Sequence, residues 1–176
     1  MPDAQLNGLY VAAFVESAGE VSAVFEKRAM QMLTENNIDD LDEDSWYYAE
    51  DFEEAMVEIE EQVGSMTTQQ AGEKMIEVNE QIPAQDSARD GFDVLKEQHE
   101  SSYRGYSVDE VGQYRVDRLS EDHFCVATYG GWGYPEAFTK GLLKGVIQET
   151  EAGVTNPDLD PTDTEGEEVF AYEVSW

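Results

Sequence analysis

Two histidines and one cysteine are the residues most able to ligate a metal or act as a nucleophile. His99 lies in segment 87–103, whose apolar spacing predicts a helix, and a histidine on a helix can ligate haem iron or a metal ion. A structural role near Tyr103 is the alternative. His123 follows the turn "SED" and is expected on the surface. Cys125 is the only cysteine, so neither a disulfide within the chain nor a cysteine zinc site can form.

Carboxylates are too numerous in this sequence to identify a catalytic pair. The segment "DLDEDSWYYAED" partly follows a calcium-binding loop, with Asp40, Asp42 and Asp44 at alternate positions. Ser45 replaces the glycine of that loop, and Asp51 replaces its final glutamate. We therefore expect neither a calcium site nor a catalytic function.

The glycine-rich stretch "YGGWGYPEAFTKGLLKG", residues 129–145, could belong to a phosphate-binding loop. It lacks the Walker spacing of glycine, lysine and hydroxyl, and it contains no GxGxxG fingerprint. Gly130, Gly131 and Gly133 instead suit a sharp reversal from a strand into a helix, with Pro135 at the first helical position.

The helix that follows carries two glycines one turn apart. Each interior glycine costs about 1 kcal/mol relative to alanine, so Gly141 and Gly145 indicate the close approach of another surface. Two interpretations remain open. The glycine face packs closely on a sheet, or it lines a cavity with an aromatic rim. The predicted ligand pocket consists of Trp46, Trp132, Tyr134, Phe138, Gly141 and Gly145.

The apolar periodicity predicts helices in the first part of the chain and strands in the second. Segment 9–15 fits either a buried strand or the first turns of a helix. The strands "GQYRVDRLS" and "HFCVATY" predict an antiparallel hairpin with Tyr114, Val116 and Leu119 on its inner face, and residues 154–167 read as an irregular loop. The predicted helices span about 18–35, 49–63, 67–82, 87–103 and 135–152, and "VFAYEVSW" predicts a closing strand.

These elements predict a single α+β domain over residues 1–176. In this fold class, N-terminal helices pack on an antiparallel sheet, and one further helix is inserted near the C-terminus.

The strongly negative charge of the chain indicates a salt-rich solvent. The sequence has 40 Asp and Glu against 10 Lys and Arg, for a formal net charge of −30, and the acids are spread along its whole length. Such a chain suits a salt-rich cytoplasm, as in a halophilic archaeon, where salt screens the repulsion. The absence of a basic cluster argues against nucleic acid as a partner, and the apolar runs are too short to span a membrane. We expect a cytoplasmic protein.

Two parts of the sequence resemble the haem-NO-binding and 4-vinyl-reductase superfamily of small sensor domains. "VGQYRVDRLSEDHFCVATYGGWGYPEAFTKGLLKGVIQE" and the terminal "FAYEVSW" are similar to its strand pair, tyrosine-proline corner, F-x-x-G-x-x-x-G helix and last strand. "SWYYAEDFEEAMVEIEEQVG" and "AGEKMIE" resemble its earlier helices.

The resemblance implies a non-catalytic sensor with a small apolar or haem-like ligand, and we expect a homo-oligomer such as a dimer. Haem-binding members use a proximal histidine, for which His99 is the candidate, and a Y-x-S-x-R motif that holds the propionates. The segment "YRGYS", residues 103–107, does not supply that motif, and the metal-binding cysteines of other members are missing. The alternative is a protein-interaction or scaffolding domain of the same fold with a filled core.

The charge generates a first prediction. Lowering the salt from about 1 M to tens of millimolar lengthens the Debye screening distance from roughly 3 Å to roughly 20–30 Å. The excess carboxylates then repel one another across the molecule, so we expect loss of structure, measured by circular dichroism during dialysis. Unchanged stability in dilute buffer would contradict the halophilic interpretation.

Overall fold

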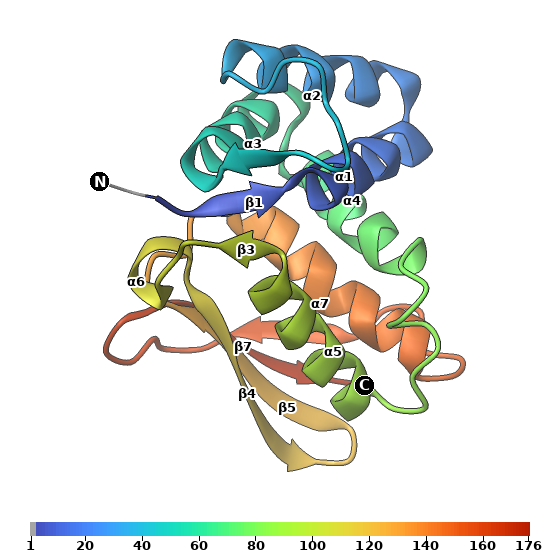
Figure 1. The fold of residues 1–176 in the computed structure, drawn as a ribbon. Helices are drawn as coiled ribbons and strands as arrows, with labels where there is room; N and C mark the ends of the chain where they lie inside the picture. Colours follow the sequence, from blue (N-terminus) through green and yellow to red (C-terminus); the bar gives the residue numbers. More distant parts are fainter. Residues whose placement is uncertain (1–2) are drawn as a thin grey trace.

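A computed structural model describes residues 3–176 and has the α+β architecture that the sequence predicts (Figure 1). No helix within these residues is long and apolar enough to cross a membrane. The helices are α1 (Gly8–Val21), α2 (Ala23–Glu35), α3 (Ala49–Val63), α4 (Ser65–Glu77), α5 (Ala88–Ser101), α6 (Val108–Val111) and α7 (Glu136–Thr150). The strands are β1 (Gln5–Asn7), β2 (Trp46–Tyr48), β3 (Tyr103–Arg104), β4 (Gln113–Ser120), β5 (His123–Tyr129), β6 (Asp158–Pro161) and β7 (Glu168–Ser175).

The strands form two antiparallel sheets. A small sheet has the order β2-β1-β3, and a larger one has the order β4-β5-β7-β6. Helices α1, α2 and α3 lie at one end of the molecule and the larger sheet at the other, with α4, α5 and α7 between them (Figure 1). The small sheet ties the chain start to the segments before α3 and after α5.

The N-terminal segment is helical, and the helix predicted over 18–35 is two helices. Asn7 caps α1 by accepting a hydrogen bond from the Tyr10 amide at 2.8 Å. Ser22 then adopts an extended backbone that ends α1, and its hydroxyl accepts from the Phe25 amide to start α2. A serine is among the best N-caps, which is why the chain turns at this residue.

The glycines of α7 face a helix and not the sheet. A Cβ at Gly141 would overlap the Gln69 carbonyl oxygen of α4, and one at Gly145 would lie 2.8 Å from Ile76 Cβ. On the α4 side, a Cβ at Gly72 would lie 2.5 Å from the Phe138 carbonyl oxygen. Glycines on both helices therefore let the two backbones touch.

The hairpin forms as predicted, except at its tip. Tyr114 is buried, but Leu119 is 56% exposed, because it is an odd number of residues from Tyr114 and lies where the pairing of β4 shifts between Arg118 and Ser120. The segment expected to be an irregular loop contains β6, which pairs with the C-terminal half of β7, from Tyr172 to Ser175.

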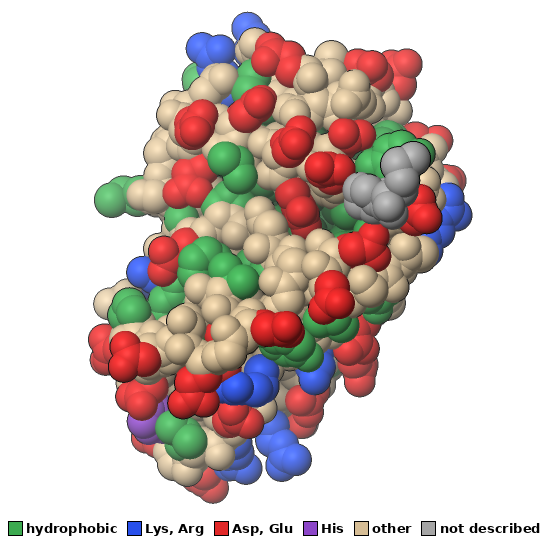
Figure 2. Space-filling view, turned by 90° about the vertical axis from the view of Figure 1, so that its left-hand side faces the viewer, with side chains coloured by type: hydrophobic (Ala, Val, Ile, Leu, Met, Phe, Trp, Pro, Cys, Tyr) green, Lys and Arg blue, Asp and Glu red, His purple; other side chains and the backbone are tan. Residues whose placement is uncertain are grey.

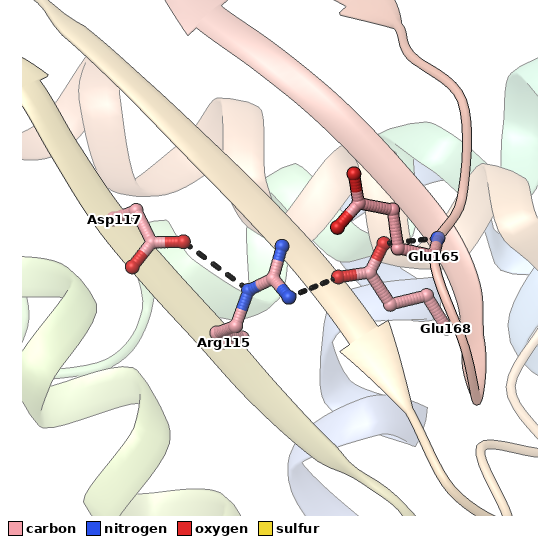
Figure 3. A network of polar contacts seen from close by, with 4 residues as sticks. All are labelled: Arg115, Asp117, Glu165 and Glu168. Carbon is pink, nitrogen blue, oxygen red and sulfur yellow. Dashed lines mark hydrogen bonds and ion pairs between the residues drawn. The ribbon is translucent and has the colours of Figure 1, made fainter.

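A salt-bridge network lies on the larger sheet, where Arg115 contacts Asp117 and Glu168 (Figure 3). Arg115 Nη1 lies 2.5 Å from Glu168 Oε1, and Arg115 Nε lies 3.2 Å from Asp117 Oδ2. Arg115, Ala127 and Ala171 occupy one row across β4, β5 and β7, and both alanines are buried. The arginine therefore spans small side chains to reach the acid two strands away.

Acidic side chains are scattered over the face shown in Figure 2 and do not gather into one patch. This dispersion agrees with a general adaptation to solvent better than with one basic partner.

The contact between α4 and α7 generates a second prediction. Gly141→Ala should lower the free energy of unfolding by about 2 kcal/mol, because overpacking outweighs the gain in helix propensity. Urea denaturation measures the change.

Gly19→Ala in α1 is the matched control, because its Cβ would meet only the flexible end of Glu26. It should be neutral or stabilise the protein by up to about 1 kcal/mol. Equal effects of the two substitutions would show that the helices do not need the glycine contact.

Candidate functional site

A cavity of about 330 Å³ opens between α1, α4 and α5. Its lining mixes apolar and polar side chains, and the carboxamides of Asn79, Gln81 and Gln98 form what we call its mouth. Leu9, which is 58% exposed, adds an apolar side chain at the rim. The inner wall includes Tyr10, Ala13, Met75, Ile76, Leu95 and Leu142.

The carboxamides of the mouth are bonded to one another. Asn79 Nδ2 donates to Gln98 Oε1 at 2.8 Å, and Gln98 Nε2 donates to Gln81 Oε1 at 3.0 Å. Asn79 Oδ1 also accepts from the backbone amides of Gln81 and Ile82, which orders the chain after α4. The mouth is therefore polar, neutral and held in place.

His99 reaches the cavity from α5. Its side chain is almost fully buried, and its Nε2 lies 3.0 Å from the Gly112 carbonyl oxygen. Its ring stacks on Trp132, with centroids 5.0 Å apart, and meets the edges of Tyr103 and Tyr114. Aromatic side chains thus enclose the imidazole on the side away from the cavity.

His99 is held in its neutral form. Burial lowers its pKa from 6.5 to about 4, and the hydrogen bond to Gly112 only partly opposes this shift. A carbonyl oxygen can only accept, so the neutral ring carries its proton on Nε2.

Three of the residues predicted for the ligand pocket lie together behind His99. Trp132, Tyr134 and Phe138 are buried, and the Tyr134 ring lies 5.4 Å from Trp132 and 5.8 Å from Phe138. Trp132 Nε1 donates to Thr139 Oγ1 at 3.1 Å, and the Tyr134 and Tyr103 hydroxyls are hydrogen-bonded. That these residues contact a ligand stays a prediction.

The other predicted residues lie elsewhere. Gly141 and Gly145 face α4, although Leu142 between them lines the cavity. Trp46 lies on β2, where the Arg104 guanidinium sits 4.4 Å from its ring centroid. Of the residues singled out from the sequence as site candidates, His99 is the one that lines the cavity.

The remaining candidates from the sequence form no metal site. No group of three or more His, Cys, Asp or Glu able to hold a metal occurs within residues 3–176. His123 Nε2 lies 3.5 Å from Glu173 on the sheet, and the Asp42 carboxylate accepts from the Asp44 amide of its own turn. Burial raises the pKa of the Cys125 thiol, which disfavours the nucleophilic thiolate.

Glu53 is a second perturbed group, but it lies outside this cavity. Burial, and then the charge of Glu50, raise its pKa from 4.5 to about 8. Its Oε1 has no hydrogen-bond partner among the described residues, and the carboxylate presses against Gly133 at the corner before α7. This close contact explains why position 133 is a glycine.

Sequence reasoning missed the cavity residues of α1 and the carboxamides after α4. Tyr10 and Ala13 lie in the segment that could have been a strand, so no helical face was assigned to them. Asn79, Gln81 and Gln98 are ordinary surface residues by type, and only the fold brings them together.

The neutral His99 generates a third prediction. Below about pH 6.5 the unfolded chain binds a proton at this residue more readily than the folded protein does, so acidification should cost stability down to about pH 4. His99→Gln keeps a donor toward Gly112 and does not titrate. We expect its deficit relative to wild type to shrink by about 2 kcal/mol between pH 7 and pH 5. A deficit that does not change with pH, in urea titrations, would mean that His99 is not held neutral.

No protein-family model matches the chain, and no curated protein matches it either. Solved structures do. A mutant H-NOX domain of T. tengcongensis superposes with a TM-score of 0.67 at 10% identity, covering 97% of each chain. A mutant Fe(II) unliganded H-NOX protein from K. algicida gives 0.63 at 9% identity, covering 97% of this chain and 96% of that one.

An oxygen-binding H-NOX domain related to soluble guanylate cyclases gives a TM-score of 0.62 at 11% identity, with 96% and 93% coverage. These likenesses extend over nearly the whole chain. They agree with the resemblance noted from the sequence and show that the chain has the fold of H-NOX domains.

Proposed function

We propose that this protein is a non-catalytic sensor domain that binds a small neutral molecule in the cavity between α1, α4 and α5. The observation that carries the proposal is the cavity itself, with a mixed apolar and polar lining, a mouth of carboxamides bonded to one another, and His99 among the lining residues. Its volume of about 330 Å³ lies at the lower end of ligand pockets, which run from about 300 to about 1,000 Å³.

The charges around the cavity do not fit haem. Haem carries two carboxylates, but no lysine or arginine of the described chain lines the cavity, and Glu16 is the carboxylate at its edge. No tyrosine of the sequence is followed by serine and arginine in the Y-x-S-x-R spacing. Tyr129 has Gly131 and Gly133 at those positions. Anionic propionates would therefore meet no cation.

The histidine does not fit haem either. The Nε2 of His99 donates to Gly112, and Trp132 stacks on the ring. Ligating an iron through Nε2 would break that bond. A solved structure from work on haem distortion in the H-NOX family shares the fold of this chain, and we propose that this chain uses the fold without that cofactor.

The absence of acid–base partners at the cavity supports binding without catalysis. His99 stays neutral above about pH 4, and Glu16 lies exposed at the edge. A ligand in the cavity would touch α1 from the N-terminal part and α5 beside the larger sheet. Binding would then favour one relative position of these helices, which is how a sensor transmits occupancy.

A scaffolding domain is the second candidate, and the packed cluster of Trp132, Tyr134 and Phe138 favours it. Homo-oligomerisation, a cytoplasmic location and a halophilic source remain parts of our proposal that the charge and the resemblance support.

A cavity-filling substitution tests the proposal. Wild-type protein in high salt should bind the neutral fluorescent probe N-phenyl-1-naphthylamine, and Ala13→Trp, which places an indole in the cavity, should weaken binding at least about tenfold. Ala23→Trp, on the exposed surface of α2, is the matched control and should bind as wild type does. The melting temperature of each variant verifies folding.

Equal probe binding by the two tryptophan variants would place the ligand elsewhere. After incubation with haem and removal of the unbound haem by desalting, the protein should show no Soret band, whereas a Soret band that His99→Gln removes would contradict the proposal.

A further inference from the structure

We infer that the ligand of this cavity is a neutral molecule that donates a hydrogen bond to Nδ1 of His99. This inference rests on the proposed function and names the class of molecule that the cavity selects: a compact apolar or aromatic body with one N–H or O–H donor.

The tautomer of His99 decides what the ring offers a ligand. Because Nε2 donates to the Gly112 carbonyl at 3.0 Å, Nδ1 of the neutral ring has a lone pair and can only accept. The hydrogen bonds among residues 3–176 give Nδ1 no partner, and Nδ1 is not one of the fully buried side-chain atoms that lack one, so it keeps some access to the cavity. A donor on a ligand can therefore bond to Nδ1 in place of water.

The other polar groups of the cavity are less selective. The carboxamides of Asn79, Gln81 and Gln98 already bond to one another at the mouth. Tyr10 and Tyr114 also line the cavity, and their hydroxyls can both donate and accept. Asn7, Ser101 and Ser102 line it as well: Asn7 Oδ1 accepts from the Tyr10 amide, and both serine hydroxyls donate to the Gln98 carbonyl. Nδ1 of His99 differs from all of these groups because it can only accept and has no hydrogen bond within residues 3–176.

The ligand must also be uncharged. An anion would find no cation in the lining and would face a protein with a formal net charge of −30. A cation would leave water for an inner wall that provides no carboxylate, since Glu16 remains at the exposed edge.

The experiment compares indole with benzofuran, which has nearly the same shape but an oxygen in place of the N–H. Each compound displaces N-phenyl-1-naphthylamine from the wild-type protein in high salt. Indole should bind about tenfold more tightly, as expected for one net hydrogen bond.

Two variants assign the preference to the ring nitrogen. His99→Gln keeps a donor near Nε2 and removes the acceptor at Nδ1, so the preference for indole should vanish while the probe still binds. His99→Asn places a carboxamide oxygen near the position of Nδ1 and should retain part of the preference. The wild-type comparison needs neither variant to fold.

The outcomes separate the two proposals. Equal affinities of wild-type protein for indole and benzofuran, or a preference that persists in His99→Gln, overturn this inference and leave the ligand-binding function standing. Failure of the probe and both compounds to bind overturns the proposed function and this inference with it.

Discussion

The backbone contact between α4 and α7 is the constraint on which the site depends. Gly72 on α4 and Gly141 on α7 leave no room for side chains, so the two helices meet at their backbones. This contact brings Met75 and Ile76 of α4 beside Leu142 of α7, and the three together form part of the cavity wall. Each glycine costs its helix about 1 kcal/mol of helix propensity relative to alanine. The close contact that the glycines allow fixes the part of the cavity wall formed by α4 and α7.

Helix α7 also supports His99, through the corner that precedes it. The corner before α7 carries Trp132, whose indole is fixed by Thr139 of α7 and stacks on the imidazole. Gly112, which the imidazole contacts through its carbonyl, packs against the Trp132 backbone. The histidine is thus a structural residue on one edge and a cavity residue on the other. In our proposal, the fold that this chain shares with H-NOX structures presents a neutral acceptor at this position.

Much of the architecture could be predicted from the sequence, because its signals are local. Helix α3 forms over the predicted residues, and the hairpin and the glycine corner follow from alternation and from glycines before a proline. Leu119 was placed inside although strict alternation from Tyr114 and Val116 puts it on the opposite face, and the shift in pairing beside it leaves no sequence pattern. The small sheet was missed because strands as short as β3, Tyr103–Arg104, leave no periodic pattern.

The site was less predictable for a physical reason. Gly141 and Gly145 correctly indicated a close approach, but a glycine pattern does not say whether a helix, a sheet or a ligand comes near. His99 was singled out by residue type, whereas its tautomer depends on a carbonyl thirteen residues later in the chain. The cavity itself combines residues from four helices, α1, α4, α5 and α7, and no local pattern encodes that arrangement.

The most direct test of the central claim is nitrogen-15 NMR of the His99 ring in protein titrated with indole. The account predicts a neutral ring protonated on Nε2 from about pH 5 to about pH 8, with an Nδ1 resonance that shifts as indole binds. Two results would contradict the account. One is a ring that carries protons on both nitrogens in this range. The other is an Nδ1 resonance that does not change when indole binds.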